Sequence, residues 1–261
     1  MPASLAETLA RNRREHRRSL LVYLMVDARR RAALLPLVRA CQAAGVSGIE
    51  LGFPFSDPIA DGPVLQAAAA RALQSGTGWD DLLRSVQAVS KELPVAVMTY
   101  ANPVFHHGLA IACRAIAHAG GSGLIVPDLS IEESGPWRVA ANQAGLSLVQ
   151  MGSPATSIPR VRVLAGASSG FLYLVSRFGT TGRGQRVPTN ELRARVAAAH
   201  SARPELPVLI GFGIRRAADL APVRATGADG VIVGTAVEEI LSRSSDPGLL
   251  LRFLRPLVNG L

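Results

Sequence analysis

Residues 49–66 read IELGFPFSDPIADGPVLQ. A short apolar strand is predicted to end near the carboxylate Glu50, and the following loop, rich in Pro and Gly, carries two more carboxylates, Asp57 and Asp61. Packing alone does not explain acidic groups at a strand end, because charged side chains are rarely buried without a partner. Carboxylates at a strand end can act as general acids or bases in proton transfer, so this stretch is the first candidate for a reactive site.

Short runs rich in Val, Ile and Leu recur along the chain, and each is bounded by Gly, Pro, Asp or Ser. They lie at residues 20–26, 47–52, 95–100, 123–126, 147–150, 170–175, 208–211 and 230–233. Between them lie longer segments with helical spacing, such as residues 31–44, 79–93, 109–119, 131–144 and 189–200. Continuous apolar runs predict strands buried on both faces, and their alternation with helices predicts a parallel sheet. Eight strand–helix units in about 250 residues match a single-domain (β/α)₈ TIM barrel.

The ends of the chain and the first turn support this fold. Residues 4–18 predict an extra N-terminal helix that closes the barrel floor. An open doubly wound sheet is the main alternative, and it usually has a Gly-rich turn after its first strand. Residues 26–29 are Val-Asp-Ala-Arg, without a glycine. No linker or low-complexity stretch is evident, so one domain over residues 1–261 is predicted.

Composition narrows the class of protein. The 261 residues are 48% hydrophobic, enough for one large core, and no apolar run approaches the roughly 18–20 residues that span a bilayer. The N-terminus does not resemble a signal peptide, so we expect a cytoplasmic protein without a membrane partner. Cys41 and Cys113 lie in Ala-rich helical patterns, which predicts buried free thiols rather than a disulfide.

The formal charge of +9 comes almost entirely from arginine, since Lys91 is the only lysine. The densest basic cluster lies at residues 11–18. Nucleic-acid binding would need a recognisable motif or exposed aromatic residues among the basic ones, and the aromatic content is only 5%. We therefore expect a solvated arginine-rich surface, whose field would attract anions, and no nucleic-acid partner.

Glycine-containing turns follow the last three predicted strands: Gly179-Thr180-Thr181-Gly182, Gly211-Phe212-Gly213 and Gly234-Thr235. Glycine lets the backbone approach an anion closely, and barrels of this size often bind phosphate where the loops after strands 7 and 8 meet. The alternative is that these glycines only make tight turns. Two such turns on adjacent strands favour phosphate binding.

Schiff-base and metal-dependent chemistries fit the sequence poorly. A Schiff base needs a lysine near the C-terminal end of a strand, but Lys91 precedes the strand at 95–100 and lies at its opposite end. A metal-dependent reaction needs clustered ligands, and only the adjacent His106 and His107 fall on a suitable loop. Adjacent histidines there are more typical of a solvated loop, so no metal is expected.

The run 49–63 closely resembles the signature of the tryptophan synthase alpha subunit family. Further similarities are Tyr100-Ala101-Asn102-Pro103, Pro127-Asp128-Leu129, Tyr173-Leu174-Val175-Ser176-Arg177, Gly211-Phe212-Gly213-Ile214 and Gly234-Thr235-Ala236, so that the resemblance covers about residues 45–240. It implies a TIM barrel that cleaves indole-3-glycerol phosphate to indole and glyceraldehyde 3-phosphate by a retro-aldol reaction without a cofactor.

The resemblance also implies roles for individual residues. Glu50 matches the general acid/base, and Asp61 matches the carboxylate that accepts the indole N–H. Burial should raise the pKa of Glu50, whereas Asp61 should stay ionised. The residues implied to line the substrate pocket are Tyr100, Tyr173 and Ile125, and those implied to bind phosphate are Gly182, Gly211, Gly213, Gly234 and Thr235.

The first loop departs from the family pattern, in which an aromatic-and-threonine strand leads into Gly-Asp-Pro. Here Asp27 remains, but Val26 and Ala28 flank it. Retention of the loop at 55–58 favours an alpha subunit that passes indole to a beta subunit in an α2β2 complex. The altered first loop favours a stand-alone lyase that releases indole, and a non-catalytic sugar-phosphate-binding homologue is a third alternative.

Overall fold

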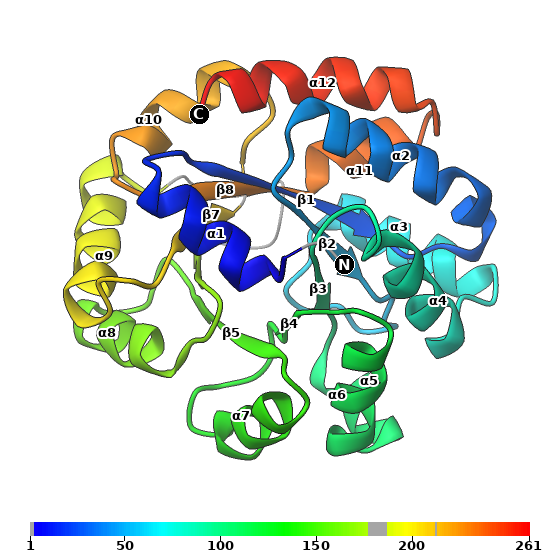
Figure 1. Ribbon diagram of the computed structural model, residues 1–261, viewed down its shortest axis with the longest axis horizontal. Helices are drawn as coiled ribbons and strands as arrows, with labels where there is room; N and C mark the ends of the chain where they lie inside the picture. Colours follow the sequence, from blue (N-terminus) through cyan, green and yellow to red (C-terminus); the bar gives the residue numbers. More distant parts are fainter. Residues whose placement is uncertain (1–2, 177–186, 212) are drawn as a thin grey trace.

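The computed structural model describes residues 3–176, 187–211 and 213–261. Its parallel strands form a closed barrel in chain order, with β8 paired to β1 (Figure 1). The strands are β1 Ser19–Met25, β2 Gly48–Gly52, β3 Val95–Met98, β4 Gly123–Ile125, β5 Ser147–Gly152, β6 Leu172–Val175, β7 Val208–Gly211 and β8 Gly230–Val233. Each of the eight predicted runs overlaps one of these strands, with ends that differ by up to two residues, and the (β/α)₈ TIM barrel is confirmed.

Helices surround the strands as a ring (Figure 1). They are α1 Leu5–Arg14, α2 Arg31–Ala44, α3 Pro63–Gln74, α4 Trp79–Val89, α5 Ala101–His107, α6 Leu109–His118, α7 Ser134–Gln143, α8 Ile158–Ala167, α9 Thr189–Ala202, α10 Leu220–Arg224, α11 Thr235–Leu241 and α12 Pro247–Asn259, with two 3₁₀ helices, η1 Ala28–Arg30 and η2 Ala217–Asp219. The helical segment predicted at 31–44 matches α2 residue for residue, and the other predicted segments differ from the observed helices by a few residues at their ends.

The strands are buried on both faces because alternate residues point in opposite directions. Along β1, Leu21 and Tyr23 belong to the cluster inside the barrel. Val22 and Leu24 belong to the larger cluster between the strands and the surrounding helices. This two-sided burial accounts for the continuous apolar runs of the sequence.

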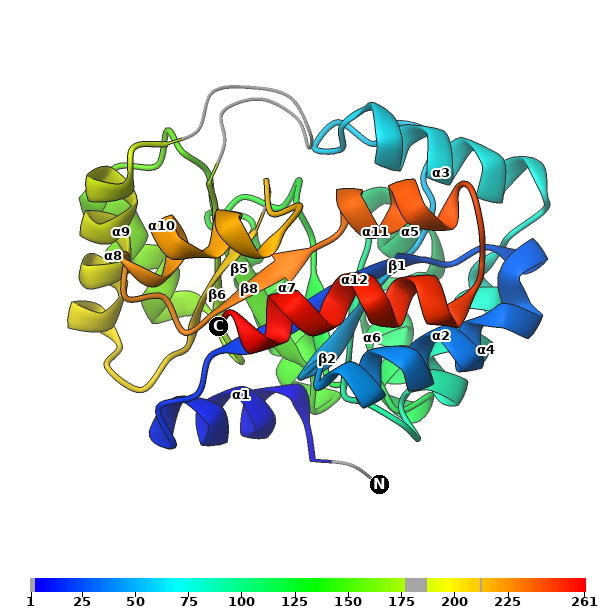
Figure 2. The same ribbon diagram turned by 90° about the horizontal axis from the view of Figure 1, so that it is seen from above.

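Helix α1 covers the floor of the barrel, as predicted, and Figure 2 shows it at the opposite end from α3. Its Leu5 and Leu9 pack into the cluster inside the barrel. The prediction of a helix as far as residue 18 was too long. The helix ends at Arg14 because His16 adopts a left-handed backbone with φ 56°, and the Arg17 N–H donates to the Asn12 carbonyl at 2.8 Å. This turn lets β1 begin at residue 19.

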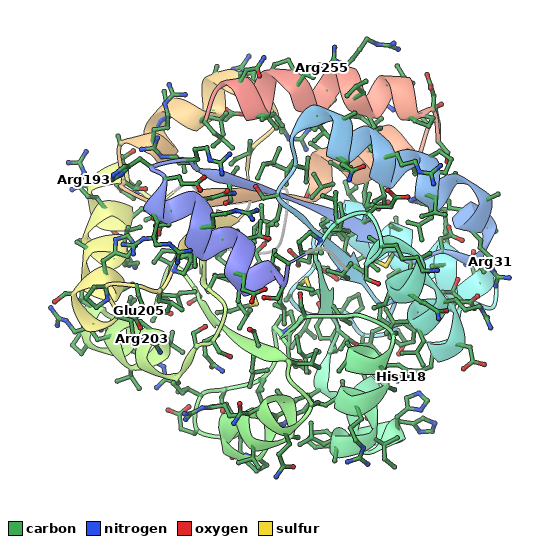
Figure 3. The ribbon with its side chains drawn as sticks, viewed as in Figure 1. Arg31, His118, Arg193, Arg203, Glu205 and Arg255 are labelled. Atoms are coloured by element: carbon green, nitrogen blue, oxygen red, sulfur yellow. The ribbon has the colours of Figure 1, made fainter. Side chains whose placement is uncertain are left out.

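The arginines form a largely exposed surface, and Figure 3 shows Arg31, Arg193 and Arg255 at the periphery of the ring. Three members of the basic N-terminal cluster make contacts within the protein, and one of them, Arg17, donates to Asn12 Oδ1 at 3.1 Å. Arg13 Nε pairs with Asp229 Oδ1 at 2.8 Å, and Arg18 donates to the carbonyl groups of Ala228 and Leu261.

The structure also bears on the cysteines and on membrane-spanning segments. Cys41 and Cys113 are buried free thiols, as predicted. Within the described residues, no helix is long and apolar enough to cross a bilayer.

Candidate active site

Glu50 lies in β2, inside the barrel and beside the C-terminal ends of the strands. Its neighbours across the sheet are Tyr23 on β1 and Ala96 on β3. The side chain is almost completely buried, and its Oε2 has no hydrogen-bond partner among the described residues. Nor does any arginine of the described chain form an ion pair with it. The alternative that Glu50 serves as a structural ion-pair partner is therefore not supported in this part of the molecule.

This environment changes the protonation of Glu50. Burial, together with the negative charge of Asp61, raises the pKa of the Glu50 carboxyl from 4.5 to about 8. The group is then mainly protonated at neutral pH. A carboxylic acid with a pKa this close to neutrality can both deliver and take up a proton, as a general acid/base must.

Asp61 lies on the loop between β2 and α3, which folds it back toward the barrel. Its N–H donates to the Pro58 carbonyl at 3.0 Å, and its own carbonyl accepts from the Gln66 side chain at 2.9 Å. Burial raises the pKa of Asp61 to about 6, and the Tyr100 hydroxyl acts in the opposite direction. Asp61 is therefore mainly ionised at neutral pH, so the two carboxyl groups occupy different protonation states, as the sequence predicted.

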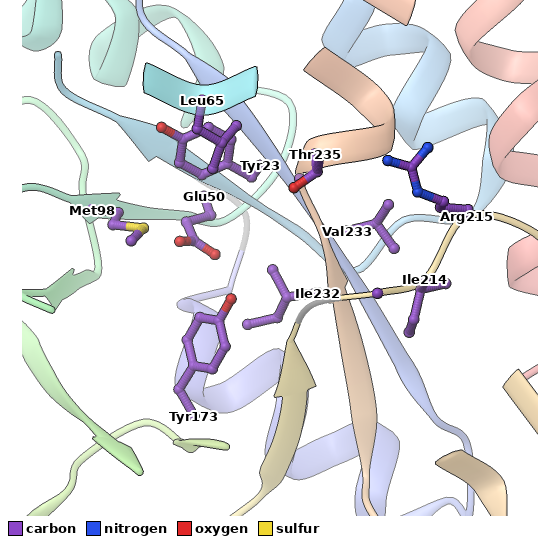
Figure 4. A pocket seen from close by; sticks show the side chains of 12 residues that line it. Tyr23, Glu50, Leu65, Met98, Tyr173, Ile214, Arg215, Ile232, Val233 and Thr235 are labelled. Carbon is purple, nitrogen blue, oxygen red and sulfur yellow. The ribbon is translucent and has the colours of Figure 1, made fainter. Parts of the chain in front are cut away.

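A small cavity, with a volume of about 30 Å³, opens beside Glu50. Figure 4 shows Glu50, Met98 and Tyr173 on one side, and Thr235, Ile214 and Arg215 on the other. The lining residues are Tyr23, Glu50, Leu65, Met98, Tyr173, Gly213, Ile214, Arg215, Ile232, Val233, Gly234 and Thr235. A carboxyl group thus faces a set of glycine-containing turns across a largely apolar space.

Three of the predicted phosphate-binding residues line this cavity. Gly213 has a left-handed backbone with φ 85°, and Gly234 directly precedes α11, which begins at Thr235. Gly182 lies outside the described residues. Phosphate binding by these turns stays a prediction.

Gly211 has a different surrounding. A Cβ at this position would lie 2.2 Å from Cε2 of the Tyr173 ring. Gly211 does not line the cavity, so the structure gives it a steric role: it leaves space for Tyr173.

Of the three predicted pocket residues, one lines the cavity and two do not. Tyr173 lines the cavity, and burial raises its pKa well above the usual value, so its hydroxyl stays neutral. Tyr100 instead supports the Asp61 loop, because its hydroxyl accepts from the Ala60 N–H at 3.1 Å. Ile125 lies in the cluster inside the barrel but does not line the cavity.

Comparison with known proteins identifies the family. A model of the tryptophan synthase alpha chain family matches residues 9–248. The chain belongs to this family. It is 40% identical to the tryptophan synthase alpha chain of Methanosarcina mazei over 230 residues, which cover 87% of this chain and 83% of that one. It is 42% identical to the chain of Chloroflexus aurantiacus over 244 residues, with 92% and 90% covered.

Solved structures agree with this assignment. A Mycobacterium tuberculosis tryptophan synthase structure has a TM-score of 0.87 and 32% identity, with 99% of this chain and 98% of that chain covered. The tryptophan synthase alpha subunit of Legionella pneumophila has a TM-score of 0.85 and 29% identity, with coverage of 99% and 98%. The family match therefore extends beyond residues 45–240 and includes the altered loop after β1.

In this tryptophan synthase alpha chain homologue, that loop is part of a charged network. Asp27 accepts from the Arg29 N–H at 3.0 Å, which caps η1. Arg30 donates to Glu238 on α11 at 2.8 Å, and Glu238 in turn accepts from the Met25 N–H at 2.8 Å. Arg30 and Glu238 thus connect this loop and the end of β1 to the helix that begins at Thr235.

Seven lining residues were not predicted as site residues from the sequence: Tyr23, Leu65, Met98, Ile214, Arg215, Ile232 and Val233. Tyr23 is the one that the sequence could most readily have indicated, because it is the single aromatic residue in the first apolar run. Its inward direction depends on the pairing of β1 with β2, which the sequence does not specify. Arg215 directly follows the predicted turn at 211–214 and was hidden among many arginines.

Two residues weighed for other chemistries lie away from this cavity. Lys91 lies four residues before the start of β3, at the end of the strand opposite the cavity, as predicted. His107 stacks on Trp79 with a distance of 4.4 Å between ring centroids, and therefore contributes to packing.

Proposed function

We propose that this chain catalyses the retro-aldol cleavage of indole-3-glycerol phosphate to indole and glyceraldehyde 3-phosphate, as the alpha subunit of tryptophan synthase. The observation that carries this proposal is the buried Glu50 carboxyl, which faces the Gly213 and Gly234 turns across one cavity. Membership of the tryptophan synthase alpha chain family supports the choice of substrate.

Glu50 performs the proton transfers of this reaction. In its protonated state it delivers a proton to the indole carbon that carries the glycerol chain, which makes the ring an indolenine-like cation. The resulting carboxylate takes the proton of the adjacent glycerol hydroxyl as the carbon–carbon bond breaks. The bonding electrons return to the ring, and the products are indole and an aldehyde. The raised pKa of Glu50 suits both steps.

Asp61 stabilises the intermediate. The positive charge develops on the indole nitrogen, and an ionised carboxylate that accepts its N–H lowers the energy of that state. Because the site is buried, the interaction is stronger than it would be in water. At the other end, Gly213, Gly234 and Thr235 hold the phosphate.

A tryptophan synthase beta subunit is the partner in this proposal, and the cytoplasm is its location. Ile59, at the tip of the Asp61 loop, is 72% exposed, so this loop offers an apolar contact to a partner chain.

The decisive experiment is an assay of indole release from indole-3-glycerol phosphate, with and without an added tryptophan synthase beta subunit. Turnover that requires or is strongly increased by the beta subunit supports the alpha-subunit function. Full turnover of the chain alone supports the stand-alone lyase instead. The absence of turnover in both assays contradicts both enzymes and leaves the sugar-phosphate-binding homologue.

A further inference from the structure

Among the described residues that line the cavity, one carries a positive charge, and this is Arg215. It follows Gly213 and Ile214 directly and shares the cavity with Gly234 and Thr235. In Figure 4 the Arg215 guanidinium group extends toward the side on which Thr235 lies. The phosphate of the proposed substrate is expected at this same end.

Glu239 on α11 fixes the Arg215 side chain. The two terminal nitrogens of Arg215 donate to the two carboxylate oxygens of Glu239 at 2.7 and 2.6 Å. The backbone N–H of Arg215 donates to Asp219 Oδ2 at 2.9 Å, which holds the start of the side chain. A guanidinium group has five N–H donors, and this pairing uses two of them, so three remain for another acceptor.

Phosphate binding in this cavity would be favoured by a positively charged side chain. Glu50 is mainly protonated at neutral pH, and a phosphate ester brings negative charge into the cavity beside it. Backbone N–H groups of glycine turns supply only partial positive charges, whereas an arginine supplies a full one with a geometry suited to phosphate. The side chain of Arg215 is 50% exposed, so it can reach an entering ligand without first losing its water completely.

We propose that Arg215 is a phosphate-binding residue of this chain, and that Glu239 is the positioning residue that holds its guanidinium group at the cavity. This inference rests on the proposed function and deepens it, since it adds a charged side chain to the glycine turns. The role of Arg215 is to bind the substrate and not to take part in bond cleavage. Its removal therefore affects KM more than kcat.

The test compares Arg215→Gln with Arg216→Gln. Arg216 is the neighbouring exposed arginine and does not line the cavity, so its variant controls for the loss of one positive charge. We expect Arg215→Gln to raise KM for indole-3-glycerol phosphate about tenfold with kcat nearly unchanged, as for the loss of one partly exposed charged hydrogen bond. Arg215→Lys should recover part of the loss, and Arg216→Gln should match the wild type.

Glu239→Gln tests the positioning role. Arg215 remains in this variant but loses its charged partner, so KM should rise by less than in Arg215→Gln. In the wild type, added NaCl should raise KM, and this dependence should be weaker in Arg215→Gln, because part of the ionic contact is absent. Equal KM values for the wild type and Arg215→Gln in a folded, active protein would overturn the proposal.

Binding of inorganic phosphate, measured by calorimetry, separates this proposal from the proposed function. If the wild type binds phosphate, Arg215→Gln binds it about tenfold more weakly and no indole is released, the proposed function fails and the role of Arg215 stands. If the wild type releases indole but Arg215→Gln keeps both its KM and its phosphate affinity, the role of Arg215 fails and the function stands. If the wild type neither binds phosphate nor releases indole, both fail.

Discussion

Gly52 leaves the space that the Tyr23 hydroxyl occupies: a Cβ at position 52 would lie 2.0 Å from that oxygen and 2.3 Å from Cζ of the ring. Tyr23 lines the cavity and is the β1 neighbour of Glu50. The glycine at the end of β2 thus allows a large aromatic side chain to lie beside the reactive carboxyl. Gly211 and Tyr173 repeat this relationship on β7 and β6.

Gly52→Ala should therefore destabilise the protein and displace Tyr23. Overpacking of this kind costs about 1–3 kcal/mol, and urea-induced unfolding measures it. Gly166→Ala is the matched control, because nothing lies within 4 Å of a Cβ at that position on α8. The control should be as stable as the wild type or slightly more so.

A second substitution checks the cause. Tyr23→Leu removes both the hydroxyl and Cζ, so it should be less harmful in the Gly52→Ala background than in the wild type. Tyr23→Phe keeps Cζ and should not give this relief. If Gly52→Ala were as stable as Gly166→Ala, the close contact would have no energetic consequence, and the explanation would be wrong.

Glu50→Gln should abolish indole release while leaving substrate binding largely intact. Glutamine has nearly the same shape but cannot exchange a proton, and general acid–base catalysis typically contributes about 10²–10⁴-fold to the rate. Steady-state assays measure kcat, and calorimetry measures substrate binding to the inactive variant. Because the Glu50 Oε2 is buried without a partner, the variant should also be at least as stable as the wild type. A variant that kept its rate would disprove the assignment of Glu50.

The raised pKa values also predict how stability depends on pH. The Glu50 carboxyl binds its proton more tightly in the folded protein, with a pKa of about 8, than in the unfolded chain, where the value is 4.5. Its contribution to the free energy of unfolding is therefore fully present below pH 4.5 and is lost as the pH rises through 8. Asp61 acts in the same direction, from 3.8 to about 6.

The difference between wild type and Glu50→Gln isolates this effect. Between pH 5 and 8, the wild type should lose stability relative to the variant by up to about 1.4 kcal/mol per pH unit, the value for one proton. Glu205→Gln is the control: Arg203 holds the pKa of Glu205 below its usual value, so its contribution is constant above pH 5. A Glu50→Gln difference that stayed flat over this range would show that Glu50 is not buried in the way described.

The parts that sequence could predict are those that depend on residue type alone. The eight strands could be predicted because their residues are buried on both faces, and Glu50 and Asp61 were selected as candidates because carboxylates at a strand end and on its following loop suit proton transfer. The roles of the other residues depend on which side chains lie close together in the folded protein. The role of Gly211 follows from the direction of the Tyr173 ring, and that of Tyr100 from the fold of the Asp61 loop. Tyr23 was missed because strand register decides which side chains of β1 face Glu50.

A buried ion pair connects the altered loop after β1 to α11. Glu238 is completely buried, and Arg30 Nη1 donates to it at 2.8 Å, so the two charges compensate each other. Among the described residues, Arg30→Met would leave the buried Glu238 with only the Met25 N–H as a partner, at a cost of about 3–5 kcal/mol in the free energy of unfolding. Arg29→Met is the matched control, because the Arg29 side chain is 53% exposed and its pairing with Asp27 should contribute little.

Glu238→Gln in the Arg30→Met background should recover much of the loss, since glutamine is neutral and its oxygen can still accept from the Met25 N–H. If the two single variants, Arg30→Met and Arg29→Met, unfolded at the same urea concentration, the pair would not be what connects this loop to α11.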